Sequence, residues 1–393
     1  MGTIKYLDES DIHDKRVLMR ADFDVSFNED LTIADDVRIK NNIPTIKYLL
    51  DRNNRVICIA KLGRPKGRDP NPKYSLKVVV ERLKHYFPEN KITLVNDFEK
   101  DASALEKQQP NEVLVLENIR FYPEEKANDP EFAKRLAAFG DIYVNDAFAM
   151  CHRSEATTVG LPKLLPGYAG IQLKKELQMI CKVIENPQKP VVAIMGGAKI
   201  STKIPVMGKL NEMADDLLVG GGIANMLLKA KGLQIGKSFI EEDSMAAAEQ
   251  LTTAAAQQST HIVLPEDAVV APDKTSTNGV VKKVEDVTAE DAMYDIGPET
   301  QAHYGAIIAK AKTIIWNGPV GYVENPEFRR GTDFIYYSIA NNHDAVSIVG
   351  GGDTLTAISK KEYLEKITHI STGGGAMLEF IEKGTLPGIE ALQ

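Results

Sequence analysis

Short strand-forming runs alternate with stretches of helical spacing through the first part of the chain, up to about residue 165. Ile33–Leu50 and Ser75–Tyr86 carry apolar residues at the spacing of a helix. The runs that predict strands are Arg16–Arg20, Arg55–Ala60, Lys91–Val95, Glu112–Leu116 and Ile142–Val144. This alternation predicts an α/β fold with a mainly parallel sheet flanked by helices.

One helical stretch separates this series from a second one. Residues 161–167 predict a loop because they hold two prolines and a glycine. Helical spacing then runs from about Tyr168 to Glu185, and an Asn-Pro pair closes it. A second series of strands and helices opens at Pro190. We therefore expect two lobes with a boundary near this helix.

Glycines directly follow five predicted strands of the second half. Val346–Val349, for example, runs into Gly350–Gly352 and then into a helical pattern. The other glycine turns are Gly196-Gly197, Gly220–Gly222, Asn317-Gly318 and Gly373–Gly375. In an open parallel sheet such turns gather at the carboxyl edge, where ligands bind. Glycine backbone N–H groups and helix N-termini can bind phosphate, so we expect a nucleotide-binding site along this edge.

Asp353 follows the Gly350–Gly352 turn, and a carboxylate suits a phosphate site only if a cation lies between them. Mg²⁺ is commonly held by one carboxylate together with phosphate oxygens. The alternative is that Asp353 is an N-cap in an ordinary tight turn. The recurrence of the turns favours the nucleotide interpretation.

Charged residues follow the predicted strands of the first half. They are Arg20, Asp22, Asp24, Lys61, Arg64, Arg120 and Arg153, with Arg38 at the start of a helix. Each arginine alone could be a solvated surface charge. A parallel sheet would bring the set to one edge, where the planar guanidinium groups match phosphate and carboxylate. We therefore expect a cleft for a small, highly anionic acid.

Composition narrows the class of protein. The chain has 393 residues and a net charge of −8, which argues against nonspecific nucleic-acid binding. Three scattered cysteines suggest buried thiols in a reducing compartment. No apolar run reaches the roughly 18 residues of a membrane span, and no signal-peptide pattern opens the chain. We expect a cytoplasmic protein that does not bind membranes.

Nine segments form a more specific pattern. They are Arg20–Val25, Leu62–Lys66, Leu116–Phe121, Asn145–Phe148, Gly196–Lys203, Asp295–Pro298, Trp316–Gly321, Gly350–Thr354 and Ser371–Gly375. Their order and spacing together are highly specific, and through them the chain resembles the phosphoglycerate kinase family over its whole length.

The resemblance implies two Rossmann-like lobes joined by a helical hinge, in a monomer. The implied acid-binding domain is residues 1–167, with 376–393 returning to it. The hinge helix would be 168–186 and the nucleotide-binding domain 187–375. The implied reaction is reversible phosphoryl transfer between 1,3-bisphosphoglycerate and MgADP, giving 3-phosphoglycerate and MgATP in glycolysis.

The resemblance also implies the roles of individual residues. The acid would be bound by Asp22, Phe23, Asp24, Arg38, Lys61, Leu62, Gly63, Arg64, Arg120 and Arg153. The nucleotide would be bound by Lys203, Glu324, Gly351, Gly352, Asp353 and Thr354, with Asp353 as the Mg²⁺ ligand. Catalysis would rest on Arg38, Lys199, Lys203, Gly352 and Gly375. No covalent intermediate is needed, because such transfers run on positioning and electrostatics.

Three positions depart from the family pattern. Asp24 stands where the family usually has Asn, Lys61 where it has His, and Glu155 where a histidine often follows Arg153. We expect an ion pair between Lys61 and Asp24 that offsets the added negative charge. Two alternatives stay open: a kinase of another small anionic acid, and a catalytically silent nucleotide-binding scaffold.

Overall fold

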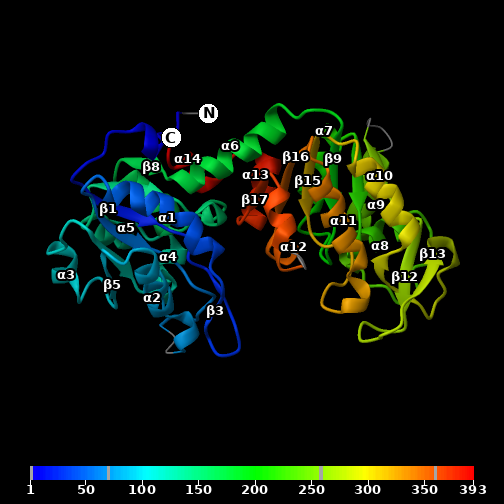
Figure 1. The fold of residues 1–393 in the computed structure, drawn as a ribbon, viewed down its shortest axis with the longest axis horizontal. Helices are drawn as coiled ribbons and strands as arrows, with labels where there is room; N and C mark the ends of the chain where they lie inside the picture. The colour runs from blue at the N-terminus through cyan, green and yellow to red at the C-terminus, as the bar shows by residue number, and fades with distance from the viewer. Residues whose placement is uncertain (1–2, 69–70, 256–259, 358–360) are drawn as a thin grey trace. The chain divides into compact units, whose positions relative to one another are not determined.

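Two six-stranded parallel sheets organise the chain, as seen in a computed structural model that describes residues 3–68, 71–255, 260–357 and 361–393 (Figure 1). Contacts divide the chain into two units. Unit 1 comprises Met1–Gln178 and Thr385–Gln393, and unit 2 comprises Met179–Gly384. The expected α/β class, with a parallel sheet flanked by helices in each lobe, is confirmed.

The sheet of unit 1 has the order β5-β6-β4-β1-β7-β8, with every neighbouring pair parallel. Its strands are β1 (Arg16–Arg20), β4 (Arg55–Ile59), β5 (Lys91–Val95), β6 (Glu112–Leu116), β7 (Ile142–Asn145) and β8 (Gly167–Ala169). Its helices include α1 (Val37–Leu50), α2 (Lys77–Tyr86), α3 (Ala102–Glu106), α4 (Pro123–Ala127) and α5 (Pro130–Ala137). The central strands are buried on both faces, which explains their continuous apolar runs.

The helix expected over Ile33–Leu50 begins later than predicted. Ile33–Asp35 forms β3, which pairs antiparallel with β2 (Ser26–Phe27). The side chain of Asp35 accepts a hydrogen bond from the backbone N–H of Val37 at 2.7 Å, so the chain turns there into α1. The apolar Ile33 mimicked a helical position, although the Asp35-Asp36 pair is a helix-start signal.

The helix that links the two units is α6 (Ile171–Glu185). It was expected to begin at about Tyr168, but Gly167–Ala169 forms the strand β8 instead. Asp146, just after β7, accepts hydrogen bonds from the backbone N–H groups of Gln172 and Leu173 at 2.9 and 3.1 Å. These two donors would otherwise be unsatisfied at the helix start, so Asp146 anchors α6 to unit 1.

The sheet of unit 2 has the order β11-β10-β9-β15-β16-β17, again entirely parallel. Its strands are β9 (Val191–Met195), β10 (Asp216–Val219), β11 (His261–Val263), β15 (Thr313–Asn317), β16 (Val346–Gly350) and β17 (His369–Ser371). Its helices include α7 (Ile204–Met213), α8 (Gly221–Ala230), α9 (Met245–Ala255), α10 (Pro298–Ile308), α11 (Arg330–Asn341), α12 (Gly352–Thr356) and α13 (Gly374–Lys383).

Unit 2 also holds a small antiparallel sheet that the sequence did not predict. Its order is β13-β12-β14, formed by Val280–Lys283, Asp267–Ala271 and Ala292–Ile296. It has a separate apolar cluster, which includes Leu228, Ile235 and Val270.

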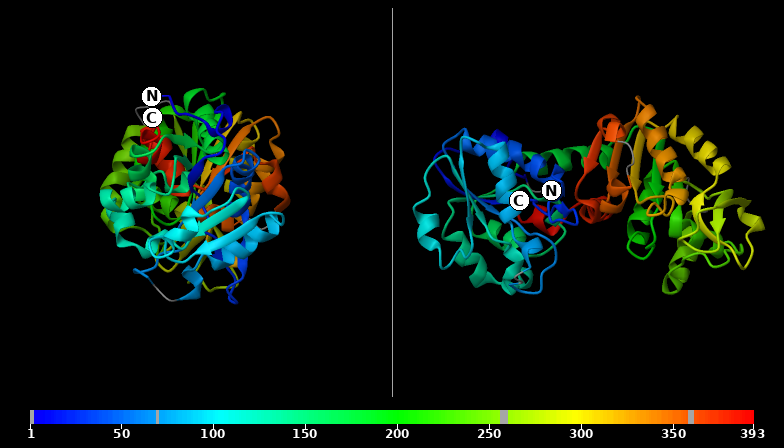
Figure 2. Two further views of the ribbon diagram at one scale, coloured as in Figure 1. Left: turned by 90° about the vertical axis from the view of Figure 1, so that its left-hand side faces the viewer. Right: turned by 60° about the horizontal axis from the view of Figure 1, so that its bottom comes forward.

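The end of the chain returns to unit 1 (Figure 2). The return was expected from residue 376, but the contact division keeps α13 with unit 2, where it packs against α7. Helix α14 (Pro387–Glu390) packs against the π-helical turn Ala156–Gly160, and the N–H of Gly388 donates to the carbonyl of Cys151 at 2.8 Å. Within the described residues, no helix is long and apolar enough to cross a bilayer.

Candidate active site

The expected acid-binding residues follow four adjacent strands of unit 1. Asp22 and Asp24 follow β1, Lys61 and Arg64 follow β4, Arg120 follows β6, and Arg153 follows β7. These strands lie side by side in the order β6-β4-β1-β7 and run parallel. Their carboxyl ends therefore share one edge, as the sequence predicted.

Arg38 is held beside this edge by Asp22. The Arg38 Nη1 donates to Asp22 Oδ2 at 2.6 Å, and the Asp22 side chain is almost fully buried. The Asp22 carboxylate raises the pKa of Arg38 above its ordinary value. Asn42 completes the arrangement, since its side chain accepts from the Asp22 N–H and donates to the Arg38 carbonyl. The guanidinium is thus held by Asp22, and Asn42 ties the backbone of Asp22 to the first turn of α1.

The expected ion pair between Lys61 and Asp24 is confirmed. The other Asp24 oxygen accepts from the Gly63 N–H at 2.7 Å. Burial by itself would raise the pKa of Asp24, but Lys61, the Gly63 N–H and Arg38 together lower it below its ordinary value. Burial also lowers the pKa of Lys61, which alone would favour a neutral amine. Two hydrogen bonds, from the Lys61 amine and the Gly63 N–H, favour the ionised form of the Asp24 carboxylate.

A hollow of about 570 Å³ opens within unit 1. It is lined by Arg64, Arg120, Lys126, His152, Arg153, Ser154 and Glu155. Three arginines expected from the sequence are thereby brought together, while Lys126 and His152 were not anticipated. Lys126 lies on the short helix α4, and no strand-end signal marks it. Such a concentration of cations suits an anion with several charges.

Arg20 does not belong to this cationic set, contrary to the sequence-based expectation. It is fully buried, and its Nε donates to the Thr157 hydroxyl at 2.9 Å. Glu125 accepts from the same hydroxyl, and burial raises the pKa of Glu125 to about 7 although Arg20 opposes the rise. As the last residue of β1, Arg20 points into the interior, where this polar cluster holds it.

The five glycine turns of unit 2 follow five adjacent strands, in the order β10-β9-β15-β16-β17. They therefore lie along one edge. Backbone bonds interlock them: the Gly197 N–H donates to the Pro319 carbonyl at 2.7 Å, and the Gly221 N–H to the Val320 carbonyl at 2.9 Å. Gly351 has φ +111, a conformation that side chains rarely adopt.

Space is open beside two of the expected catalytic glycines. A Cβ on Gly352 or Gly375 would meet no atom within 4 Å. By contrast, a Cβ on Gly196 would lie 2.2 Å from the Pro319 carbonyl oxygen. Gly196 is thus required by packing within the edge, whereas Gly352 and Gly375 border open space at the starts of α12 and α13.

Lys203 is half-buried at this edge. Its Nζ donates to the Gly196 carbonyl, and burial lowers the pKa of Lys203 to about 8 although Asp353 opposes the shift. Lys199 and Asp353 are exposed, as is Glu324 in the segment between β15 and α11. Thr354 is fully buried, and its hydroxyl accepts from the Gly318 N–H at 2.7 Å and donates to the Gly350 carbonyl at 3.0 Å. Its side chain joins two of the glycine turns.

The residues at this edge fit a Mg²⁺ ion that arrives with a nucleotide. The structure shows no cluster of three or more metal-ligating side chains within the residues it describes. Asp353 offers one exposed carboxylate at the first turn of α12, beside the open space at Gly352. One carboxylate with phosphate oxygens and waters is the usual way in which proteins hold Mg²⁺.

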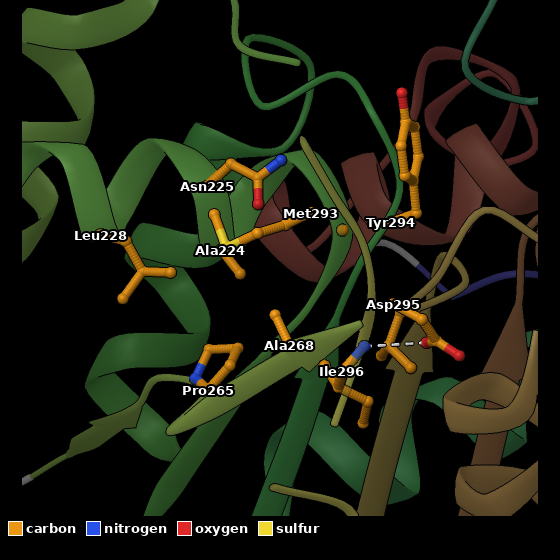
Figure 3. Close-up of a pocket in the computed structure, with 11 residues that line it drawn as sticks. Ala224, Asn225, Leu228, Pro265, Ala268, Met293, Tyr294, Asp295 and Ile296 are labelled. Carbon is orange, nitrogen blue, oxygen red and sulfur yellow. Dashed lines mark hydrogen bonds between the residues drawn. The ribbon is translucent and has the colours of Figure 1, made fainter. Parts of the chain in front are cut away.

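A small cavity lies between α8 and the antiparallel sheet (Figure 3). Its volume is about 20 Å³, enough for one water and too little for a nucleotide base. Asp295 on its wall accepts from the backbone N–H groups of Ile296 and Gly331 at 2.9 and 2.8 Å. Burial raises the pKa of Asp295 to about 8. Asp295 therefore fixes the first turn of α11, which is a structural role.

Comparison with known proteins gives one consistent result. Residues 7–384 match the family model for phosphoglycerate kinase. The phosphoglycerate kinase of Dictyoglomus turgidum is 44% identical over 396 residues, covering 100% of this chain and 98% of the relative. That of Chloroflexus aggregans is 46% identical over 388 residues, covering 96% of each.

Solved structures agree with the sequence comparison. The phosphoglycerate kinase of Coxiella burnetii has a TM-score of 0.88 at 38% identity and covers 99% of both chains. That of Pyrococcus horikoshii has a TM-score of 0.85 at 29% identity, covering 99% of this chain and 98% of the other. The chain therefore belongs to the phosphoglycerate kinase family of glycolytic phosphotransferases.

Proposed function

We propose that the basic hollow of unit 1 binds 3-phosphoglycerate and that the glycine edge of unit 2 binds MgADP or MgATP. The chain then transfers the acyl phosphate of 1,3-bisphosphoglycerate to MgADP, reversibly, as a cytoplasmic monomer whose α6 is a hinge. The observation that supports this best is the hollow, where three arginines, a lysine and a histidine meet beside a sheet edge. A dianionic phosphate with a carboxylate matches such a set.

For the acid, we propose binding by Asp22, Phe23, Asp24, Arg38, Lys61, Leu62, Gly63, Arg64, Arg120 and Arg153. Arg64, Arg120 and Arg153 line the hollow and would take the phosphate. Arg38, oriented by its bond to Asp22, would face the acid or the phosphoryl group in transfer. Asp22 and Asp24 orient Arg38 and Lys61 through ion pairs.

For the nucleotide, we propose that the phosphates lie over the open space at Gly352 and Gly375, next to the backbone of Gly351. Lys203 and Lys199 would neutralise them, and Glu324 would accept from ribose hydroxyls. Thr354 would act by fixing the turn at Gly318. Asp353 would hold the Mg²⁺, which when bound supplies positive charge between phosphate oxygens. These residues position and neutralise charge, which is how phosphoryl transfer is mainly catalysed.

An assay that couples ADP release to a spectroscopic signal tests the proposal. Turnover of 3-phosphoglycerate with MgATP is expected. Turnover only with other small acids would favour the second candidate, a kinase of another small anionic acid. The observation in favour of that candidate is that the Asp24 and Glu155 carboxylates reduce the positive charge at the acid site. Nucleotide binding without any turnover would identify a scaffold.

Arg38→Ala tests whether this arginine acts on the transferring group. We expect kcat to fall by roughly 10³-fold or more, as for other arginines that stabilise such transition states. Steady-state kinetics with both substrates measures this. An unchanged kcat with a raised KM would instead assign Arg38 to substrate binding alone.

A further inference from the structure

Glu155 is the one carboxylate among the described residues that line the basic hollow. Its Oε1 accepts from Nη2 of Arg120 at 3.0 Å. The two side chains are only 6% and 4% exposed, so this is a buried ion pair in the wall of an anion site. Buried charges need partners, and Glu155 supplies one to Arg120 in the absence of a ligand.

The backbone around Glu155 holds it in place. Its carbonyl accepts from the N–H groups of Thr158 and Val159 at 3.0 and 2.8 Å, where the π-helical turn Ala156–Gly160 begins. Thr157 is itself bonded through its N–H and hydroxyl to Glu125. The Glu155 carboxylate therefore cannot withdraw from the hollow by a simple loop movement.

The pair is not saturated by hydrogen bonds. Within the part of the chain that the structure describes, Nε of Arg120 and Oε2 of Glu155 are buried without a hydrogen-bond partner. Arg120 thus keeps donor capacity beyond its bond to Glu155, while Glu155 keeps a negative charge beside any anion that enters the hollow. Like charges brought together in this way weaken binding.

We propose that Glu155 is an internal counter-anion that sets the affinity and selectivity of the hollow. It holds Arg120 in position when no ligand is bound, and it competes with the ligand for the same guanidinium. Its repulsion acts more strongly on a doubly charged phosphate monoester than on a singly charged carboxylate. This role rests on the proposed assignment of the hollow to the acid, and it makes Glu155 a positioning and selectivity residue.

Calorimetric titration of the full chain with 3-phosphoglycerate tests this role. In Glu155→Gln, the neutral amide keeps the shape and removes the charge, so we expect Kd to fall about tenfold. KM should fall in parallel while kcat stays within about twofold. Binding of glycerate, which lacks the phosphate, should gain less than that of 3-phosphoglycerate, because repulsion by Glu155 scales with the charge of the ligand. A merely structural Glu155 would give equal or weaker binding in the variant, which would overturn the proposal.

Glu131→Gln is the matched control. Glu131 pairs with Lys134 on the outer face of α5, and both side chains are exposed. It removes the same charge from an exposed position of unit 1 outside the hollow's lining, so Kd should stay within about twofold. An equal gain in both variants would attribute the effect to net charge and would also overturn the proposal.

A second comparison covers the case in which Glu155→Gln does not fold. Replacing a buried ion pair by apolar residues is often tolerated. We therefore compare Arg120→Met with the double variant Arg120→Met/Glu155→Met. The double variant should bind 3-phosphoglycerate more tightly, because the single one leaves Glu155 facing the anion alone; equal Kd values would refute the proposal. Absence of binding and turnover in the unmodified chain would refute the proposed function instead.

Discussion

The desolvated position of Lys203 makes its protonated amine unfavourable in the folded chain, which lowers the stability of the protein. Its pKa in the folded chain is about 8, below the ordinary value of 10.5. Below pH 8 the amine is protonated in both the folded and unfolded chains, so the cost is fully present. Between pH 8 and 10.5 the unfolded chain binds more protons, and stability rises with pH. A nucleotide phosphate would compensate the charge that makes Lys203 costly.

Lys203→Met should therefore stabilise unit 2 at pH 7 while abolishing tight nucleotide binding. We expect the free energy of unfolding to rise by about 1–3 kcal/mol. Each unit of lowered pKa corresponds to roughly 1.4 kcal/mol, and the lost hydrogen bond to Gly196 reduces the total. Urea unfolding followed by the fluorescence of Trp316, the sole tryptophan and a buried residue of β15, measures it. The gain should shrink from pH 8 to 10. A gain that does not change with pH would contradict the explanation.

The Lys61–Asp24 pair occupies two of the three positions at which the sequence departs from the pattern expected of the family. Lys61→His alone would leave Asp24 facing an anionic acid, and Asp24→Asn alone would free Lys61 for phosphate. We expect their effects on the Kd for 3-phosphoglycerate to be non-additive, with a coupling of roughly 0.5–3 kcal/mol. A double-mutant cycle at two salt concentrations measures it, and salt should reduce the coupling. Additive effects at low salt would show that the pair does not govern binding.

At the scale of elements, the strands were the most predictable part of the chain. β1, β5 and β6 have the bounds that the sequence predicted. β1 and β6 are buried parallel strands, which are continuous apolar runs ended by charge. β3 and β8 were missed because their short segments carry little periodicity. The antiparallel sheet was missed because β13 is exposed and half charged.

The candidate site was predictable where residues follow strands and unpredictable where pairing depends on tertiary structure. Asp22, Lys61 and Arg64 share an edge simply because their strands are parallel neighbours. The burial of Arg20 against Thr157 could not be foreseen, because the two are 137 positions apart. Lys126 and Glu155 were also not foreseen, because they reach the hollow from segments outside the strands.

The docking of α14 on unit 1 predicts the effect of one substitution. A Cβ on Gly388 would lie 2.7 Å from the Thr158 methyl group and 2.9 Å from the Cys151 Cα. Gly388→Val should therefore push α14 away and destabilise unit 1 by about 1–3 kcal/mol. Hydrogen exchange in unit 1 should rise while the Trp316 unfolding transition of unit 2 stays unchanged.

Gly384→Asn is the control for this change. Gly384 has φ +72 and open space around it, a conformation that asparagine tolerates. It should leave hydrogen exchange in unit 1 close to that of the unmodified chain. Equal effects of the two variants would mean that the contact with Cys151 and Thr158 is not what holds α14.

At the scale of the whole molecule, the two ligands are expected to bind to separate units. Asp353→Ala should weaken MgADP binding by about tenfold or more and leave 3-phosphoglycerate binding intact, because the carboxylate lies in unit 2. Titration of each ligand alone measures this. Asp344→Ala is the control, since Asp344 is an exposed carboxylate just before β16. Loss of both affinities in Asp353→Ala would point to misfolding.

The return of the last residues to unit 1 affects how the chain matures on the ribosome. Unit 1 is complete only when Thr385–Gln393 emerges, after all of unit 2 has been made. At roughly 5–20 residues per second, the intervening segment takes about 10–40 s to synthesise. During that delay the Cys151 carbonyl, one position before the hollow-lining His152, lacks the Gly388 N–H that bonds it in the finished protein. The hollow of unit 1 therefore gains this support only after the whole of unit 2 has been synthesised.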